Sequence, residues 1–450
     1  MANIRLWIQA AGKRLRHLLA LPGAAASYAA GKWKAHQEED GMAASARLPK
    51  LSPAAASRLK DAWLKLEAGA AASTGQGQAF TPPAEGEAAS AAAGAGWSAD
   101  ELMLIRRIRA ETEEANRNNV TRTEAYRNVY FRLPELHWAL LAHLVSRNGG
   151  WNMTDLQGEW LPRLLTERQR SVTFQFLERA NWLIFQDAYP QLLLYQWSLR
   201  QGRSLFHLLP AFGVSAFMKP VWRLFWRERD SAMLTTALIV NEQHYIEERV
   251  VRHPYFREHV TDTMFFGLQS LMQLNGVVFP YGSGREGAEN ELKLAGLIME
   301  RFQNLEERIE FGKRLYAVLF GIPEVYEGAK CFAAAVKHTG SRADYAPHLF
   351  EAVRAHPPQR PYEEKLLGGR LKPGASRIFS PPLSSAWPDS KAEPAEPGDW
   401  FRSARQVTDY FRDLPLPPHF EMTNEYGLML NKLELAVLAS QRGAGGNGGG

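Results

Sequence analysis

The residues best suited to chemistry are a histidine and two carboxylates in the segment 231–251. His244 and Glu247 are three positions apart, so on a helix they lie one turn apart on the same face. An imidazole beside a carboxylate can act as a general base or a metal ligand, with Glu247 or Glu242 orienting the ring. The same groups can instead be structural, each satisfying the other and the neighbouring helices. The pattern leaves both alternatives open.

A second concentration of polar residues covers 146–155, directly behind a helical pattern. The Asn-Gly-Gly sequence at 148–150 predicts a helix stop, because glycine tolerates the left-handed conformation that ends many helices. The rest of the block is then expected to be a loop, and loops on a rigid scaffold often carry function. Arg147, Trp151 and Asn152 have no local structural duty in such a loop, so they are the first candidates for a site.

A third polar block covers residues 338–348 and contains Arg342. Its guanidinium could bind a carboxylate or phosphate, or could tie the block to an acid of the core such as Glu178 or Glu242. If the protein is an enzyme, hydrolase-like or metal-dependent, these polar blocks should converge on one pocket. The residues expected there are Arg147, Asn148, Trp151, Asn152, Asp155, Glu178, Asn181, Asp187, Asn241, Glu242, His244, Arg342 and Tyr345.

Several specific signatures are absent from the sequence. It has no Glu-x-x-His, no His-Glu-x-x-His, no phosphate-binding Gly-x-x-x-x-Gly-Lys-Ser/Thr and no Gly-x-Ser-x-Gly. Each of these would place ligands or a nucleophile in a known geometry. No metal site is therefore predicted, and neither a cofactor nor a catalytic residue is assigned.

Helical periods dominate the elements that would position these residues. Thr121 with Glu124, and Thr166 with Gln169, have the spacing of capping boxes. Pro190 is expected to reset the helix that contains it, and only residues 277–279 look like a strand. The predicted fold class is all-α: a multi-helix globular bundle with irregular polar loops, flanked by disordered low-complexity segments.

Composition divides the chain into six segments. Small-residue and proline-rich stretches cannot bury enough apolar surface to order themselves, so they are predicted to be linkers. The segments are a basic amphipathic N-terminus (1–66), an Ala/Gly-rich linker (67–96), the main helical domain (97–355), a Pro-rich linker (356–399), a C-terminal helical segment packing on the core (400–440) and a Gly-rich tail (441–450).

Positive charge concentrates at the N-terminus. Residues 1–66 hold eleven Lys and Arg against four acids, a charge of +7, whereas the whole chain carries +5. The folded part is therefore nearly neutral, and no nucleic-acid partner is expected. Residues 4–19 have an apolar and a cationic helical face, which suits an anionic membrane surface, although a docked or disordered basic segment has the same pattern. The single cysteine, Cys331, indicates a reducing compartment.

Long blocks of the sequence are similar to a known family. They include Leu-His-Trp-Ala-Leu-Leu-Ala-His at 136–143, Asp-Ala-Tyr-Pro-Gln-Leu-Leu-Leu-Tyr at 187–195, Leu-Phe-His-Leu-Leu-Pro at 205–210 and the blocks at 241–247 and 338–348. Over roughly residues 115–350 the chain resembles the YppC-like family of uncharacterised proteins from spore-forming Gram-positive bacteria. That family is a domain of unknown function, so the resemblance implies no reaction and transfers no site residue.

Two functional hypotheses follow. The first is a cytoplasmic helical binding or scaffold protein, with an unknown protein partner or small molecule and with a peripheral position at the inner membrane face as an added option. The second is the enzyme whose pocket is described above. Convergence of the polar residues on one cavity would favour the enzyme.

Overall fold

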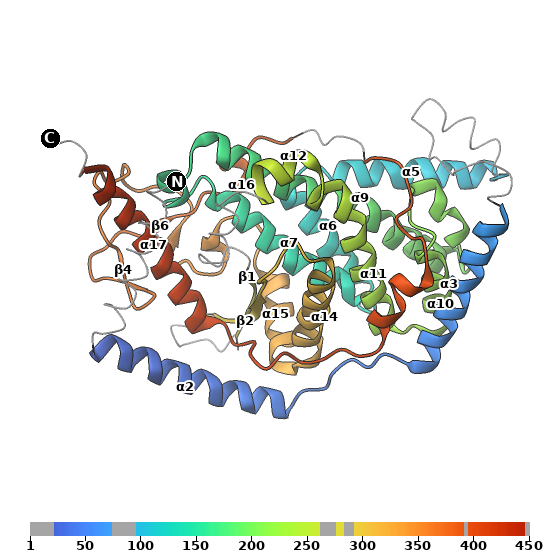
Figure 1. The fold of residues 1–450 in the computed structure, drawn as a ribbon, viewed down its shortest axis with the longest axis horizontal. Coiled ribbons are helices and arrows are strands. Elements are labelled where there is room, and N and C mark those ends of the chain that lie inside the picture. Colours follow the sequence, from blue (N-terminus) through green and yellow to red (C-terminus); the bar gives the residue numbers. More distant parts are fainter. Residues whose placement is uncertain (1–21, 74–95, 262–275, 283–291, 391–394, 446–450) are drawn as a thin grey trace.

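The protein is mostly helical, and it is described here from a computed structural model that covers residues 22–73, 96–261, 276–282, 292–390 and 395–445 (Figure 1). The α-helices are α2 (Pro22–Ala44), α3 (Pro53–Ser73), α5 (Ala99–Ala115), α6 (Asn119–Arg132), α7 (His137–Asp155), α8 (Leu161–Leu164), α9 (Glu167–Gln201), α10 (Met218–Glu228), α11 (Ser231–Ile246), α12 (Pro254–Phe256), α14 (Leu305–Gly321), α15 (Pro323–Ala335), α16 (Leu383–Ala386) and α17 (Thr423–Gly445). Shorter 3-10 turns are Phe206–Phe212, Arg342–Asp344, Ala404–Gln406 and Thr408–Phe411, and π-turns are Glu247–Val251 and Arg257–Thr261.

In the described part of the chain three small sheets interrupt the helices, so the prediction of a purely all-α fold is corrected to a mostly helical one. Strands β1 (Gly276–Tyr281) and β2 (Lys293–Ile298) form an antiparallel pair in which Val278 faces Gly296. The others have two residues each: β3 (Phe350–Glu351) runs parallel to β6 (Ile378–Phe379), and β4 (Leu366–Leu367) runs antiparallel to β5 (Arg370–Leu371).

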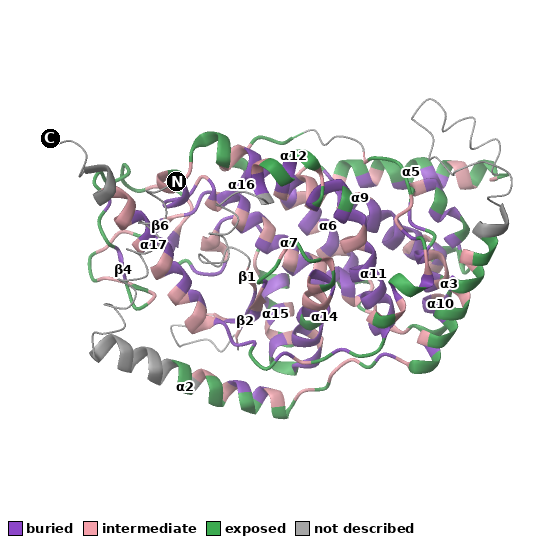
Figure 2. Ribbon diagram, viewed as in Figure 1, coloured by how far each residue is buried: buried purple, intermediate pink, exposed green. Residues whose placement is uncertain are grey.

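The core lies where α6, α7, α9, α11 and α14 pack together (Figure 2). Large aromatic side chains fill it, including Trp138, Trp151 and Trp222, each almost completely buried. Strand β1 lies against α7 and α15 and joins the small sheet to this helical core. Burying side chains of this size provides the main favourable free energy of folding.

The predicted loop at 146–155 is wrong. Helix α7 continues through Gly149 and Gly150 to Asp155. The reason is packing, since a Cβ on Gly150 would lie 2.3 Å from Oδ1 of Asn119 and 2.6 Å from Nε2 of His338. This glycine therefore permits a close helix approach instead of ending a helix.

Two other helix boundaries differ from the prediction. Helix α6 begins earlier, because Asn118 and Thr121 form its capping box in place of Thr121 and Glu124. Helix α9 does not reset at Pro190 but runs unbroken for 35 residues. Residues 187–195 are all buried, and that packing offsets the hydrogen bond that proline removes. The capping box of Thr166 with Gln169 is confirmed.

The segments outside the predicted main domain also supply buried side chains. Trp63 of α3 is fully buried and stacks on Phe217 at 4.9 Å between ring centroids. Within 356–399, predicted to be a linker, Tyr362, Leu366 and Ile378 belong to the same core. Distant parts of the chain therefore contribute to the main core of the described residues, and a smaller second cluster forms around Phe176 and Val250.

Some predictions fall outside the described residues: the membrane-binding pattern at 4–19, most of the 67–96 linker and the end of the Gly-rich tail. Within the described ranges, no helix has both the length and the apolar character needed to cross a bilayer.

Candidate functional site

The predicted site residues are divided among separate buried networks instead of surrounding one cavity. The first, the Arg342 network, comprises Asn152, Asp155, Arg342, Tyr345 and Tyr426. Nε of Arg342 donates to both carboxylate oxygens of Asp155, at 3.0 and 2.8 Å, and Nη2 lies 2.7 Å from Oδ2. Nη1 donates to the hydroxyls of Tyr345 (2.7 Å) and Tyr426 (3.2 Å), and Nη2 to Oδ1 of Asn152 (3.2 Å). The tie predicted for Arg342 exists, but its acid is Asp155, not Glu178 or Glu242.

Charge and burial act against each other in the Arg342 network. Burial alone would lower the pKa of Arg342, but Asp155 and the two tyrosines raise it well above its ordinary value. Burial raises the pKa of Asp155, and the guanidinium opposes that rise. The geometry is that of a bidentate, charge-assisted pair, which joins the end of α7 to the 3-10 turn at 342–344 and to α17.

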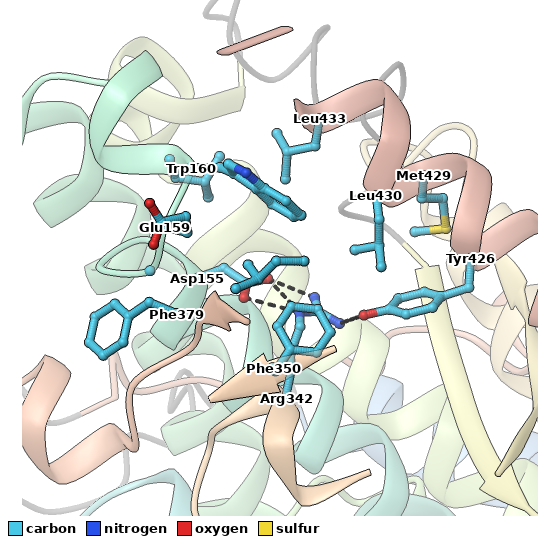
Figure 3. Close-up of a pocket in the computed structure, with 13 residues that line it drawn as sticks. Asp155, Glu159, Trp160, Arg342, Phe350, Phe379, Tyr426, Met429, Leu430 and Leu433 are labelled. Carbon is cyan, nitrogen blue, oxygen red and sulfur yellow. Dashed lines mark hydrogen bonds and ion pairs between the residues drawn. The ribbon is translucent and has the colours of Figure 1, made fainter. Parts of the chain in front are cut away.

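A cavity of about 30 Å³ lies beside this network (Figure 3). Figure 3 shows Arg342 between the carboxylate of Asp155 and the hydroxyl of Tyr426, with Trp160 and Leu430 across the space. About 10–15 Å³ of such space is enough to hold a water molecule. The cavity can therefore hold water, and it is much smaller than the groove described below.

The second, the Arg147 network, comprises Arg147, Trp151, Asn119, His338 and Asp344. Arg147 is fully buried, donates to the Val336 carbonyl (2.8 Å) and lies over the ring of Phe332. Burial lowers its pKa to about 10, and Asp344 opposes this from 3.9 Å. Burial lowers the pKa of His338 to about 4, while its Nε2 lies 2.9 Å from Oδ1 of Asn119. These contacts hold α6, α7 and the 338–344 block together.

The third, the Asp187 network, joins α9 to α11 through amides. Oδ2 of Asp187 accepts from Gln191 (2.9 Å) and Asn241 (2.5 Å), and Oδ1 of Asn241 accepts from the Trp400 indole (3.0 Å). Burial raises the pKa of Asp187 to about 7. Nearby, Glu242 accepts from the Trp138 indole (3.2 Å), and burial raises its pKa to about 8. These two acids take up protons near neutral pH.

The predicted histidine–carboxylate pair does not form a catalytic arrangement. His244 stacks on Trp400, with 4.2 Å between ring centroids and 6° between planes, and burial lowers its pKa to about 4. Glu247 instead pairs with Arg308 and, at 2.6 Å, with Arg252. No described hydrogen bond joins the ring of His244 to Glu242 or Glu247.

The remaining predicted residues bond to the backbone or to another buried side chain. Asn148 bonds to both the N–H and the carbonyl of Val278 in β1, each at 2.9 Å. Glu178 pairs with the buried Arg122 at 2.5 Å. Asn181 donates to the Leu177 carbonyl of its own helix, at 2.8 Å. Each of these contacts holds one element against another or within itself.

Sequence reasoning missed several members of these networks. Asn119, His338, Asp344, Gln191 and Tyr426 complete them but were not selected. It also missed a groove of about 650 Å³ among α5, α6, α9 and residues 334–338. Polar residues that recur on the exposed faces of α5 and α6 look like ordinary solvated helix surface, so no local signal marks the groove.

Comparisons with known proteins place the chain in a family whose function is unknown. A family model described as "Protein of unknown function (DUF2515)" matches residues 114–429, and the chain belongs to this family. The chain is also 40% identical, over 324 residues, to the "Uncharacterized protein YppC" of Bacillus subtilis (strain 168), covering 72% of this chain and 91% of that protein. The predicted YppC-like resemblance is thus confirmed, and neither description names an activity. No solved structure matches the chain.

Proposed function

We propose that this protein is a cytoplasmic binding protein whose helical body presents a charged groove to a protein partner. The groove among α5, α6, α9 and residues 334–338, about 650 Å³ in volume, is the observation that carries the proposal. Its charged lining residues are Glu111, Glu114, Arg117, Glu124, Arg127, Arg132 and Lys337.

The lining of the groove favours a polypeptide over a small molecule. Small-molecule pockets have only a few polar groups, whereas charged side chains of both signs are numerous among the residues that line this groove. Arg127 is held in place because it donates to the carbonyls of Ala333 (2.8 Å) and Ala334 (3.1 Å). Arg132 and Lys337 are exposed. When such charges face opposite charges on a partner, they select and orient that partner more than they add affinity.

The enzyme hypothesis has less support. Its candidate residues lie in separate networks, and most of their polar atoms bond to other buried groups. The cavity beside Arg342, at about 30 Å³, is small compared with the groove of about 650 Å³. A scaffold whose polar groups are used internally fits binding better than catalysis.

The groove is tested by site-specific photo-crosslinking in cells of the source organism. A photoreactive amino acid replaces Asn128, which lines the groove, or Arg412, an exposed residue outside it, as the control. We expect one protein adduct from position 128, absent from position 412 and lost when Arg132→Glu and Lys337→Glu are added. The same adducts from both positions, or none from position 128, would contradict the proposed groove.

A peripheral membrane position rests on residues 1–21, which carry four Lys and Arg and no acid. Its test is flotation with anionic vesicles, comparing the full chain with a chain that lacks residues 1–21. Deleting 1–66 would be unsuitable, because it removes Trp63 from the core. Equal flotation of both chains, or none by either, would rule out this position.

A further inference from the structure

Three potential metal ligands from opposite ends of the chain meet where α2 lies against the C-terminal segment. His36 and Glu39 are one turn apart on α2, and His419 lies just before α17. One donor atom from each of the three side chains falls within 4.8 Å of the other two. Sequence analysis predicted no metal site, and 380 residues separate Glu39 from His419.

Glu39 is held in the orientation that such a site needs. Its Oε1 accepts the backbone N–H groups of Phe420 and, at 3.0 Å, Glu421. The residue is 6% exposed, so this carboxylate cannot rotate freely. Its second oxygen, Oε2, therefore stays directed at the two imidazoles, 3.2 Å from Nδ1 of His419 and 3.9 Å from Nδ1 of His36.

These separations suit ligands of one ion. Two donors bound to a tetrahedral zinc ion at about 2.0–2.1 Å lie roughly 3.3 Å apart. The distance from Glu39 to His419 already matches, whereas that from Glu39 to His36 must shorten by about 0.6 Å, and the two imidazole donors, which lie within 4.8 Å of each other, must also approach. His36 is exposed and lies on a helix surface, so a rotation of its side chain can supply that shift.

A carboxylate also lies near the second nitrogen of His36. This nitrogen, Nε2, is 3.8 Å from Oδ2 of Asp40, just beyond hydrogen-bond distance. Metal-bound histidines usually direct their second nitrogen to a carboxylate, which fixes the tautomer. The side chains of His36 and His419 are 55% and 77% exposed, so an ion can reach them from solvent.

We propose that His36, Glu39 and His419 bind one Zn²⁺, with water at the fourth position. The ion joins α2 to His419, and the residues that follow it, Phe420 and Met422, bond to Gly296 and Leu294 of β2. Because metal binding contributes directly to the stability of the structure that forms the site, zinc strengthens the attachment of the N-terminal helix to the body.

The test is titration of Zn²⁺ into the untagged, metal-free full chain by calorimetry, with Co²⁺ absorption as a second measure of tetrahedral binding. We expect one equivalent of metal per chain. His36→Ala and His419→Ala should each weaken binding at least tenfold, because even losses of outer-shell partners cost about 10- to 100-fold. His356→Ala, an exposed histidine outside the cluster, is the matched control and should bind as the wild type.

Limited proteolysis measures the attachment of α2 separately. Zinc should slow cleavage N-terminal to residue 52 at least severalfold in the wild type and in His356→Ala, but not in His36→Ala or His419→Ala. Binding well below one equivalent, or unchanged affinity in both histidine variants, would overturn the metal site. Stoichiometric binding with unchanged proteolysis would overturn the role in attaching α2.

Discussion

Asp155 at the end of α7 and Asp187 in the middle of α9 are both deeply placed carboxylates, but the protein satisfies them differently. Asp155 faces the guanidinium of Arg342 through a bidentate contact. Asp187 accepts from the neutral amides of Gln191 and Asn241, and no described ion pair joins it to a cation. A charged partner compensates a buried negative charge, whereas amides compensate it only in part.

The difference shows in how the pKa of each acid responds to burial. Burial raises the pKa of Asp187 to about 7, so this side chain is protonated in mildly acidic solution. Burial raises the pKa of Asp155 as well, but the guanidinium of Arg342 opposes that rise. The Arg342 network therefore joins chain segments through an ion pair. In the Asp187 network, an acid whose pKa is about 7 lies between α9 and α11.

The largest expected effect comes from removing the charge that compensates Asp155. Arg342→Met keeps most of the side-chain volume but leaves Asp155 without its cation. Breaking one partner of a buried pair costs about 3–5 kcal/mol. Chemical denaturation should show a loss of this size in the free energy of unfolding.

The double variant Asp155→Asn with Arg342→Met is the control for that experiment, because replacing both charges removes the uncompensated acid. It should recover a large part of the stability lost by Arg342→Met. Arg412→Ala, in an exposed pair with Asp409, should lose less than about 1 kcal/mol. A loss from Arg342→Met no larger than that from Arg412→Ala would contradict the importance assigned to the pair.

The second prediction concerns the pH dependence caused by Asp187. The folded carboxyl has a pKa of about 7, whereas an unfolded aspartate titrates near about 3.9. Between these values the folded state holds a proton that the unfolded state has released, so the free energy of unfolding falls as the pH rises. The slope from this site is about 1.4 kcal/mol per pH unit, and it ends above pH 7.

Asp187→Asn removes this slope because asparagine does not titrate. Its amide oxygen can still accept hydrogen bonds from Gln191 and Asn241, so the packing is kept. Denaturation of the wild type and the variant at pH 5, 6 and 7 measures the difference. We expect the variant to become the more stable of the two as the pH increases. Asp409→Asn, at an exposed position, is the control and should keep the wild-type slope. Parallel curves for wild type and Asp187→Asn would show that Asp187 is already ionised at pH 5.

A third, smaller effect is expected from the amide that compensates Asp187. Asn241→Ala removes the donor to Asp187 and the acceptor of the Trp400 indole. Leaving buried polar groups unsatisfied costs about 1–3 kcal/mol. The free energy of unfolding should fall by that amount, with a change in tryptophan fluorescence from Trp400. Asn181→Ala, which loses a hydrogen bond only within its own helix, should lower the free energy of unfolding less. An equal decrease in the two variants would contradict the role of Asn241 in compensating Asp187.

The smallest effect is expected at the edge of the Arg342 network. Tyr426→Phe deletes a hydroxyl that accepts from Arg342 and Tyr345 while the Asp155 pair remains. A typical hydrogen bond contributes about 1 kcal/mol, so thermal and chemical denaturation should show a loss near that value. Tyr255→Phe, at an exposed ring, is the control and should be neutral. A loss as large as that of Arg342→Met would mean that Tyr426, and not the ion pair, is the main contributor.

Much of the helical content could be predicted from the sequence, because helices leave a local periodic signal. The capping box of Thr166 with Gln169 marks the start of α9 correctly, and Gly202 ends it in the left-handed conformation. The predictions failed where a residue type has two uses. Gly150 and Pro190 commonly end helices, but in this protein the first permits close packing and the second is held within a buried helix.

The candidate site could be predicted in its residue types but not in its pairings. Asp155 and Arg342 were both selected, yet their contact spans 187 positions and has no signal along the chain. Asn148 was selected as part of a loop, although its amide bonds to the backbone of Val278, 130 positions away. Asn119 and His338 were missed because neither departs from the pattern of its own segment.

The sequence by itself determined the mostly helical class, the start of α9, the family and the concentration of polar residues in a few blocks. These features depend on spacing within one or two helical turns, which the chain records directly. Only the tertiary structure decided which acids pair with a cation, which accept hydrogen bonds from amides instead, and which side chains meet at α2. Those outcomes depend on burial and on contacts between distant segments, because the free energy of a charge is set by what surrounds it in space.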